Sequence, residues 1–321
     1  MKRFGNLYNK IYHIENLKLA DKKARKGKIR GGGNLEIYSF DLRREEKLLK
    51  LQQTLIDKKY KTSSYTSFKV KDPKERVIHK LPYYPDRILH HAIMGILEPI
   101  FVSSFTNDTY SCIKGKGIHN AYFNVKKALN DKNNTKYCLK LDIKKFYPSI
   151  NHDILKKLLR KKFKDKDLLF LLDEIIESTD GVPLGNYLSQ YFANFYLTYF
   201  DHWIKEELKV KYYFRYCDDI VIFGDSKDDL RIVFNLIEKY LRDNLRLTVK
   251  SNYQIFPVNS RGVDFIGYKF YHTHILLRKR IKNNFIKMIK IDNNEKSINS
   301  YKGWLKWCNS INLQNKYLYD K

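Results

Sequence analysis

The chain has 321 residues, of which 43% are hydrophobic and 15% aromatic, a composition that excludes disorder and favours a folded protein. Its formal net charge of +27 favours nucleic acid as the partner, with an anionic membrane surface as the alternative. Four cysteines without a CxxC pair argue against structural zinc, and the lack of a long apolar run argues against a membrane span, so we expect a cytoplasmic protein.

The first third of the chain predicts a basic segment, then helices and a hairpin. Residues 1–24 are polar and basic, and the three glycines at 31–33 predict a flexible joint. The spacing of apolar residues predicts an amphipathic helix over 43–57. Residues 67–81 predict a β-hairpin, and the stretch after it predicts a largely buried helix opened by Pro85.

The middle of the chain predicts the strands that would carry the chemistry. Residues 137–143 alternate, with Leu139 and Leu141 on one face and Cys138, Lys140 and Asp142 on the other. Asp142 is therefore expected at the end of a half-buried strand, on its open side. Residues 211–223 predict two short strands that meet tightly at Cys217 and Asp218.

Helices and short strands are expected around these strands. The predicted helices cover 152–163, a second segment around 168–176, a single long buried segment at 185–208, then 229–245 and the basic stretch 278–290. Short strands are predicted at 247–250 and 264–271. The order of elements indicates an α+β fold with helices packed on one side of an antiparallel sheet.

Three aspartates are the candidates for chemistry. Asp218 and Asp219 are adjacent at a predicted strand turn, where two carboxylates repel each other unless a positive charge compensates. With Asp142 they would supply the oxygen ligands that Mg²⁺ prefers. Two such ions can hold the attacking and leaving oxygens of an in-line displacement. The alternatives are a solvated Asp-Asp turn and, for Asp142, an acid at a helix N-terminus.

Four segments resemble the palm motifs of reverse transcriptases, in the order of that family. They are 139–150 (LKLDIKKFYPSI), 182–190 (VPLGNYLSQ), 216–219 (YCDD) and 265–270 (FIGYKF). The resemblance runs from about residue 60 to the end of the last segment. It implies a right-hand polymerase with a basic N-terminal arm (1–24), fingers (25–135), palm (136–275, with a helical insertion at about 152–180) and a short basic thumb (276–321).

Within that family the chain resembles the enzymes of diversity-generating retroelements. Leu184-Gly185 and Ser189-Gln190 stand where most relatives have Gln-Gly and Ser-Pro. The likeness implies error-prone copying of an RNA template into cDNA from deoxynucleotides, by a bacterial or phage-encoded protein. It also implies a basic helical accessory protein or a structured non-coding RNA as partner.

Two other functions stay open. An antiphage defence reverse transcriptase would make cDNA from a dedicated non-coding RNA, or without a template. A non-catalytic RNA-binding module would need none of the three aspartates.

The resemblance assigns catalytic roles by position. Asp142, Asp218, Asp219 and the carbonyl of Ile143 would hold two Mg²⁺ ions, or Mn²⁺ in their place. Lys250 would protonate the leaving pyrophosphate. Tyr147 would exclude a 2′-hydroxyl, so that the product is DNA, and its alternative is an ordinary core aromatic.

The resemblance also assigns contacts to the nucleotide and the nucleic acid. The expected nucleotide contacts are Lys69, Arg76, Gly185 and Gln190, and the expected primer and template contacts are Lys114, Lys116, Gly267, Tyr268, Lys279 and Arg280. A solvated charge is the alternative for Lys69, and a buried polar group on a helix is the alternative for Gln190.

Overall fold

The computed structural model describes residues 3–28, 35–71, 75–291 and 294–319. They form two units: the first comprises Met1–Thr106, Lys144–Asp201 and Leu241–Leu247, and the second comprises Asn107–Ile143, His202–Tyr240 and Thr248–Lys321. These units do not coincide with the predicted fingers, palm and thumb, whose boundaries stay a prediction. The glycine joint at 31–33 and the hairpin tip at 72–74 lie outside the described residues.

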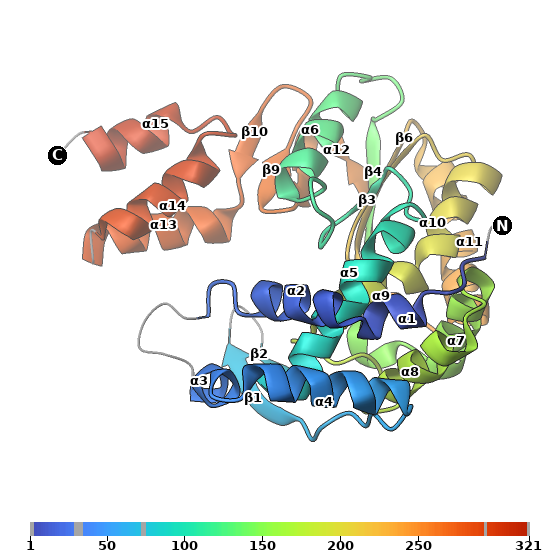
Figure 1. Ribbon diagram of the computed structural model, residues 1–321. Coiled ribbons are helices and arrows are strands. Elements are labelled where there is room, and N and C mark those ends of the chain that lie inside the picture. Colours follow the sequence, from blue (N-terminus) through green and yellow to red (C-terminus); the bar gives the residue numbers. More distant parts are fainter. Residues whose placement is uncertain (1–2, 29–34, 72–74, 292–293, 320–321) are drawn as a thin grey trace. The chain divides into compact units, whose positions relative to one another are not determined.

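The first unit is mainly helical. Its helices are α1 (Tyr8–Tyr12), α2 (Ile14–Ala24), α3 (Leu35–Asp41), α4 (Arg44–Ile56), α5 (Ile88–Val102), α7 (His152–Lys162), α8 (Lys166–Ile176), α9 (Tyr187–Tyr196) and α10 (Thr198–His202). The strands β1 (Thr66–Lys71) and β2 (Glu75–Lys80) form a separate antiparallel hairpin. Short turns at Tyr83–Arg87 and Tyr147–Ser149 complete the unit. In Figure 1, α1 and α2 lie beside α4 and against α5.

The predicted N-terminal arm forms part of this helical core. Ile11 and Leu17 are completely buried, and both belong to helices that pack on α5. The Asp21 carboxylate is 1% exposed and lies 2.7 Å from the guanidinium groups of Arg25 and Arg44. Two paired cations offset the cost of burying that charge. This predicted basic arm therefore contributes buried apolar side chains to the unit, which its sequence periodicity had not made evident.

The second unit carries a five-stranded sheet. Its strands are β3 (Thr109–Tyr110), β4 (Tyr137–Asp142), β5 (Tyr212–Tyr216), β6 (Asp219–Gly224) and β7 (Gln254–Pro257), in the order β3-β5-β6-β4-β7. All neighbours are antiparallel except β3 and β5, which are parallel. A second antiparallel sheet contains β8 (Val263–Phe265), β9 (Tyr268–Phe270) and β10 (Ile275–Leu277). The predicted α+β class and the mainly antiparallel sheet are confirmed.

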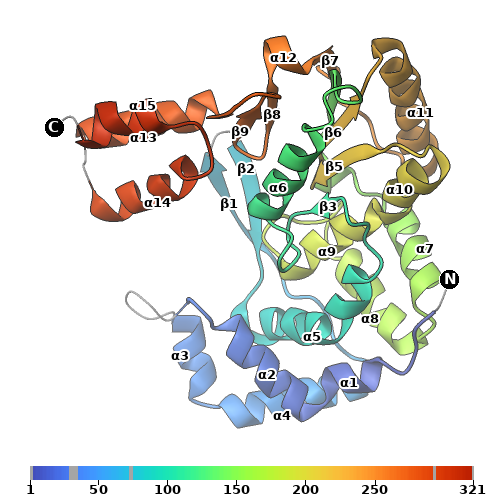
Figure 2. The ribbon, with the colours of Figure 1, turned by 90° about the horizontal axis from the view of Figure 1, so that it is seen from above.

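Helices cover these sheets and close one apolar core. They are α6 (Ile118–Ala128), α11 (Lys227–Leu245, which ends in the first unit), α12 (Val258–Arg261), α13 (Lys279–Ile291), α14 (Glu295–Leu305) and α15 (Ile311–Gln314), with turns at Trp203–Glu207 and Asn315–Tyr319. α6 packs on β3 and β5 (Figure 2). Cys138, predicted on the open face of its strand, is completely buried in this core. On that face Lys140 and Asp142 stay partly exposed.

Three predicted elements differ from the structure. The strand expected at 264–271 is an antiparallel hairpin of β8 and β9, with Ile266 and Gly267 at its turn. The long helix expected over 185–208 is divided into α9, α10 and the turn at Trp203–Glu207. Thr198 stands at the first break, and its hydroxyl donates to the Asn194 carbonyl at 3.2 Å, a bond that bends helices. The strand expected at 247–250 is reduced to one bridge between Val249 and Ile143. In the described part of the chain, every helix is too short or too polar to cross a bilayer.

Candidate active site

The strand register brings the three aspartates together at one end of the sheet. Asp142 is the last residue of β4, and it stands directly opposite Asp219, the first residue of β6. Asp218 precedes Asp219 in the connection from β5, and its carbonyl accepts a hydrogen bond from the Ile143 amide at 3.3 Å. The alternation over 137–143 predicted Asp142 at a strand end, and the tight connection predicted at Cys217 and Asp218 placed the other two aspartates at a strand turn.

The connection between β5 and β6 is a two-residue turn, Cys217–Asp218, which we call the catalytic turn. Its ends are fixed because Tyr216 pairs with Asp219. Cys217 has φ of +55°, a left-handed conformation that L-residues with a side chain rarely adopt. The Ser111 hydroxyl lies 3.0 Å from the Cys217 sulfur. Strain of this kind persists only where the surroundings hold the backbone in place.

Arg215 holds the catalytic turn from inside the sheet. Its side chain is completely buried, and its guanidinium donates to the Cys217 carbonyl at 3.0 Å. The sequence analysis missed this residue. An arginine within the apolar run YYFRY was the available signal, because a buried arginine needs partners that repay its desolvation.

Burial and mutual repulsion change the acidity of the cluster. Burial, followed by the charge of Asp142, raises the pKa of the Asp218 carboxyl to about 6. Burial likewise raises the pKa of Asp219 to about 7, although the charge of Lys140 opposes the shift. The cluster therefore resists full ionisation unless positive charge is added.

Two lysines already supply part of that charge. Lys250 Nζ lies 2.6 Å from Asp142 Oδ1, and the Lys250 amide donates to the Asp142 carbonyl at 2.9 Å. Lys140 Nζ lies 3.7 Å from Asp219 Oδ1 and also donates to the main-chain carbonyl of Asp264. Lys140 thus connects β4 and Asp219 of β6 to the β8–β9 hairpin. The sequence analysis placed Lys140 on the right face but gave it no role.

The carboxylate oxygens are donors of the kind that a divalent cation takes. Oδ1 of Asp219 is buried and accepts no hydrogen bond from the described residues, and Lys140 Nζ lies 3.7 Å away. Oδ1 of Asp142 is also buried, but Lys250 Nζ lies 2.6 Å from it. Unsatisfied carboxylate oxygens at a point of repulsion are the donors that Mg²⁺ takes. In the described part of the chain, however, no group of three or more His, Cys, Asp or Glu side chains is arranged closely enough to hold a metal. The lysine pairs described above occupy two of the carboxylates instead.

The hairpin residues Lys69 and Arg76 are exposed and do not lie together. Lys69 pairs across the hairpin with Val77, whereas Arg76 pairs with Val70. Because adjacent strand positions point to opposite faces, the two side chains lie on different faces of the hairpin. Lys69 instead makes an ion pair of 2.8 Å with Glu75. The expectation that both residues grip one triphosphate is therefore not met by this register.

Gly185 is required for packing. Its φ is +116°, and a Cβ there would lie 2.5 Å from the His79 carbonyl oxygen of β2. The Leu184 carbonyl also accepts a hydrogen bond from the His79 amide at 2.7 Å. The glycine thus allows the turn before α9 to lie against the hairpin.

The other predicted nucleotide contacts lie in the same unit. Gln190 is exposed on α9, which removes the alternative of a buried polar group. Tyr147 is half-buried in the short turn Tyr147–Ser149, and its carbonyl accepts from the Val182 amide. Neighbouring Phe146 is 3% exposed and packs in the core.

The predicted primer contacts divide into buried and exposed residues. Tyr268 is 1% exposed and its hydroxyl donates to the Trp304 carbonyl, so its side chain packs in the core instead of facing a primer. Gly267 is also buried. A Cβ at this position would lie 2.5 Å from the Trp304 ring, so the ring leaves no room for a side chain. Lys279 and Arg280, at the start of α13, are exposed.

Lys114 and Lys116 belong to the loop between β3 and α6. Lys114 is exposed, whereas Lys116 is half-buried and burial lowers the pKa of its amine. The Lys116 carbonyl accepts from the amide of Ser111, the residue whose hydroxyl contacts Cys217. This loop is therefore tied to the catalytic turn, a connection that the sequence analysis did not predict.

The sequence is similar to several curated proteins. One is Protein YkfC of Escherichia coli (strain K12), 23% identical over 264 residues that cover 68% of this chain and 68% of that protein. The retron Ec73 reverse transcriptase of Escherichia coli is 24% identical, covering 55% of this chain and 60% of that protein. The group II intron-encoded protein LtrA of Lactococcus lactis subsp. cremoris is 24% identical, covering 52% and 30%.

A solved structure and a family model complete the comparison. Apo telomerase from Candida tropicalis is 13% identical with a TM-score of 0.47, covering 70% of this chain and 52% of that one, so this chain spans about half of that protein. The family model described as reverse transcriptase (RNA-dependent DNA polymerase) matches residues 56–270. That match covers more than half of the chain and contains all three aspartates, so the chain belongs to the reverse transcriptases, the family of RNA-dependent DNA polymerases.

Proposed function

We propose that this chain copies an RNA template into DNA, with Asp142, Asp218 and Asp219 as the acidic centre of nucleotidyl transfer. The observation that carries the proposal is the half-buried carboxylate cluster at paired strand ends, in which Asp142 stands opposite Asp219 and the buried Oδ1 of Asp219 accepts no hydrogen bond from the described residues. Poly(rA) primed with oligo(dT), supplied with dTTP and Mg²⁺, tests the activity directly. Extension by the wild type and none by Asp218→Asn is expected. Full extension by the variant would contradict the proposal and favour the non-catalytic RNA-binding module.

The family generally uses divalent metal ions, and we assign their ligands here to Asp142 and Asp218, with Asp219 and the Ile143 carbonyl as further donors. Two Mg²⁺ ions, or Mn²⁺ in their place, would when bound stabilise the charge that develops on the reacting phosphate. The ligand set can be tested without turnover. Mg²⁺ is expected to raise the melting temperature of the wild type and not that of the Asp142→Asn, Asp218→Asn double variant. An equal rise in both proteins would contradict the assignment.

The residues around the cluster have separate proposed tasks. Lys250, held beside Asp142, would give its proton to the leaving pyrophosphate. Tyr147 would exclude ribonucleotides by the bulk of its ring. Replacing Tyr147 with Ala should raise incorporation of ribonucleotides while leaving that of deoxynucleotides within a few-fold, and a variant that still rejects ribonucleotides would contradict this role.

We further propose that the chain serves a diversity-generating retroelement and copies with errors opposite template adenines. The support is Leu184, which presents an apolar side chain where most relatives have a glutamine. Leu184→Gln should lower the adenine error frequency in sequenced cDNA, because it restores a hydrogen-bonding group. Leu184→Met, which stays apolar, is the matched control. An unchanged adenine error frequency in Leu184→Gln would contradict the proposed effect of this residue on fidelity.

The antiphage defence reading stays as the second candidate. Sequencing the nucleic acid that copurifies with the protein, before and after adding deoxynucleotides and Mg²⁺, separates the two. A template repeat related to a neighbouring gene favours the retroelement, and a dedicated structured RNA favours defence.

The proposed partners follow from charge and resemblance. A chain of +27 repels another basic protein unless RNA lies between them, so we expect an accessory protein to join only as part of a ribonucleoprotein. Ribonuclease treatment should release such a protein from the complex. The cytoplasmic location also remains a prediction.

A further inference from the structure

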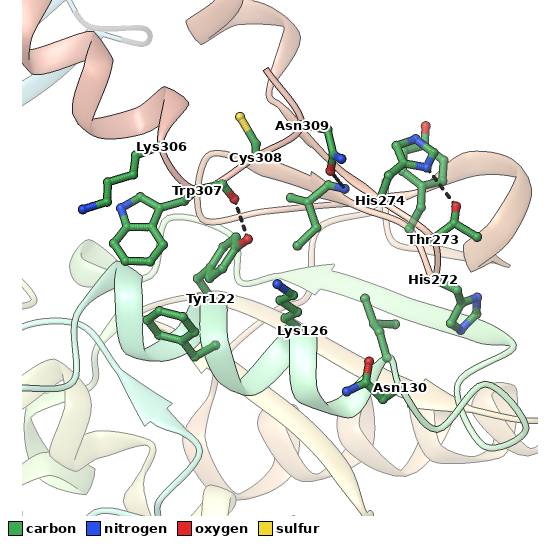
Figure 3. A pocket seen from close by; sticks show the side chains of 14 residues that line it. Tyr122, Lys126, Asn130, His272, Thr273, His274, Lys306, Trp307, Cys308 and Asn309 are labelled. Carbon is green, nitrogen blue, oxygen red and sulfur yellow. Dashed lines mark hydrogen bonds between the residues drawn. The ribbon is translucent and has the colours of Figure 1, made fainter. Parts of the chain in front are cut away.

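A pocket of about 440 Å³ lies in the second unit and contains none of the catalytic carboxylates. Three segments form it: α6 and the residues after it, the turn between β9 and β10, and the residues that follow α14. Figure 3 shows Trp307 and Lys306 at one end, His272 and Asn130 at the other, and Lys126 rising between them. This volume lies within the range of about 300–1,000 Å³ that is usual for small-ligand pockets.

The charge of the pocket favours an anion. Lys126 and Lys306 are exposed and line it, whereas no Asp or Glu occurs among the lining residues that the structure describes. His272 adds little positive charge to the pocket, because burial lowers the pKa of its ring. Its Nε2 contacts the Thr135 hydroxyl, and its Nδ1 contacts the Asn259 side-chain oxygen.

The aromatic side chains of the pocket are available to a planar ligand. Phe123 is 47% exposed, and its ring meets that of half-buried Trp307 edge to face, with centroids 5.2 Å apart. Lys306 Nζ lies 5.5 Å from the Trp307 ring centre. On the opposite side, Tyr271 and His274 stack at 4.4 Å. Exposed rings beside lysines are the combination by which proteins bind unpaired nucleotides.

We propose that this pocket binds an unpaired nucleotide of a single-stranded nucleic acid, away from the catalytic centre. The base would lie against Trp307 and Phe123, and the phosphates would lie near Lys126 and Lys306. A base within a duplex is stacked on both faces and cannot enter, so the pocket selects single strands. The site would anchor a part of the bound strand that is not being copied. It does not depend on the activity proposed above, because neither Asp218 nor a metal ion contributes to it.

The experiment measures binding without catalysis. The protein is first saturated with an unlabelled blunt RNA–DNA duplex, in EDTA and without deoxynucleotides. Fluorescein-labelled U8 RNA, dT8 DNA and a blunt hairpin are then titrated and followed by anisotropy. Trp307→Ala and Phe123→Ala should each weaken binding of the single strands about tenfold, which is the usual loss for one stacking partner. Lys126→Gln should lower the salt slope by about 0.7, the value for one lost phosphate contact.

Controls keep the proposal separate from general attraction to a basic protein. Lys239→Gln removes an exposed lysine of α11 outside the pocket and should leave the affinity unchanged. Asp218→Asn should also bind U8 as the wild type does. The affinities for U8 and dT8 then identify whether RNA or DNA is the natural occupant.

Two results would overturn the proposal. One is wild-type affinity for both single strands in Trp307→Ala and in Phe123→Ala. The other is an equal loss of affinity for the blunt hairpin in these two variants, which would show that the pocket does not select single strands. Photocrosslinking of an octamer containing 4-thiouridine adds a test on the wild-type protein. Its result does not depend on whether the variants fold. Crosslinked peptides should contain Phe123 or Trp307, and their absence would also count against the site.

Discussion

The catalytic turn and the β1–β2 hairpin both carry residues assigned to the reaction, but the protein holds them in opposite ways. The turn is fixed by strand pairing, by buried Arg215 and by Ser111. The hairpin is a two-stranded sheet whose residues are exposed or half-buried on both faces. A two-stranded ribbon alone is marginally stable. The contrast shows that packing and strand pairing hold the acidic cluster in place, whereas most side chains of the hairpin project from a ribbon with little packing around them.

The largest expected effect comes from removing one charge of the prepared centre. Asp218→Asn should lower cDNA synthesis by about 10³-fold or more, because a neutral amide holds a divalent metal ion less tightly than a carboxylate does. Primer-extension rates measure the loss. Asp229→Asn, an exposed acid on α11, is the control and should retain wild-type activity. A loss below tenfold in Asp218→Asn would mean that the cluster is not the reaction centre.

The next effect separates two tasks of Lys250. Lys250→Met should lower kcat by about 10²-fold, the usual contribution of a proton donor. Lys250→Arg keeps a positive charge beside Asp142 but is a poor acid, so it should lose nearly as much rate. The pH profile of kcat is the second measurement, and both variants should lose its alkaline limb. Full activity in Lys250→Arg would show that Lys250 only neutralises Asp142.

A smaller effect tests the register of the hairpin. Arg76→Ala should raise KM for deoxynucleotides about tenfold, because a bidentate phosphate contact is lost. Lys69→Ala should change KM by less than about threefold, since Lys69 faces the other side and pairs with Glu75. Lys71→Ala, on the face of Lys69, is the matched control. Equal increases in Arg76→Ala and Lys69→Ala would mean that the hairpin changes register or twist when the nucleotide binds.

The smallest effect concerns stability. The pKa of Asp219 is raised to about 7 in the folded chain, so folding favours its protonated form. That stability is present below about pH 4 and is lost as the pH rises through 7. Without metal, Asp219→Asn should therefore melt about 5 °C above the wild type at pH 8, and the gap should narrow towards pH 5. Thermal melts in EDTA measure it, and identical melting temperatures at pH 8 would contradict the raised pKa.

Local patterns predicted the acidic centre because every step of that inference is local. Alternation over 137–143 fixes which side chains share a face, and the tight connection at Cys217 and Asp218 fixes where the next strand begins. The register that sets Asp142 opposite Asp219 then follows from pairing two strands that both end there.

Tertiary packing determined what the sequence could not predict. Gly185 and Gly267 matched family positions, but only the folded chain shows that the His79 carbonyl and the Trp304 ring occupy the space beside them. The break before Thr198 needs no glycine or proline, so composition gave no warning of it. The hydrogen bond from buried Arg215 to the Cys217 carbonyl is likewise a contact that sequence spacing does not predict.

The burial of Tyr268 has a consequence for engineering. Its ring belongs to a core that also contains Tyr122 of α6, Phe285 of α13 and Leu305 of α14. Segments distant in the chain therefore share one set of interdigitated side chains, and such a set tolerates replacement only as a whole. A chimera that exchanges the C-terminal helices alone would leave mismatched surfaces against α6. The same core includes Phe214 of β5 and Phe223 of β6, so the transferable cassette extends to the five-stranded sheet as well.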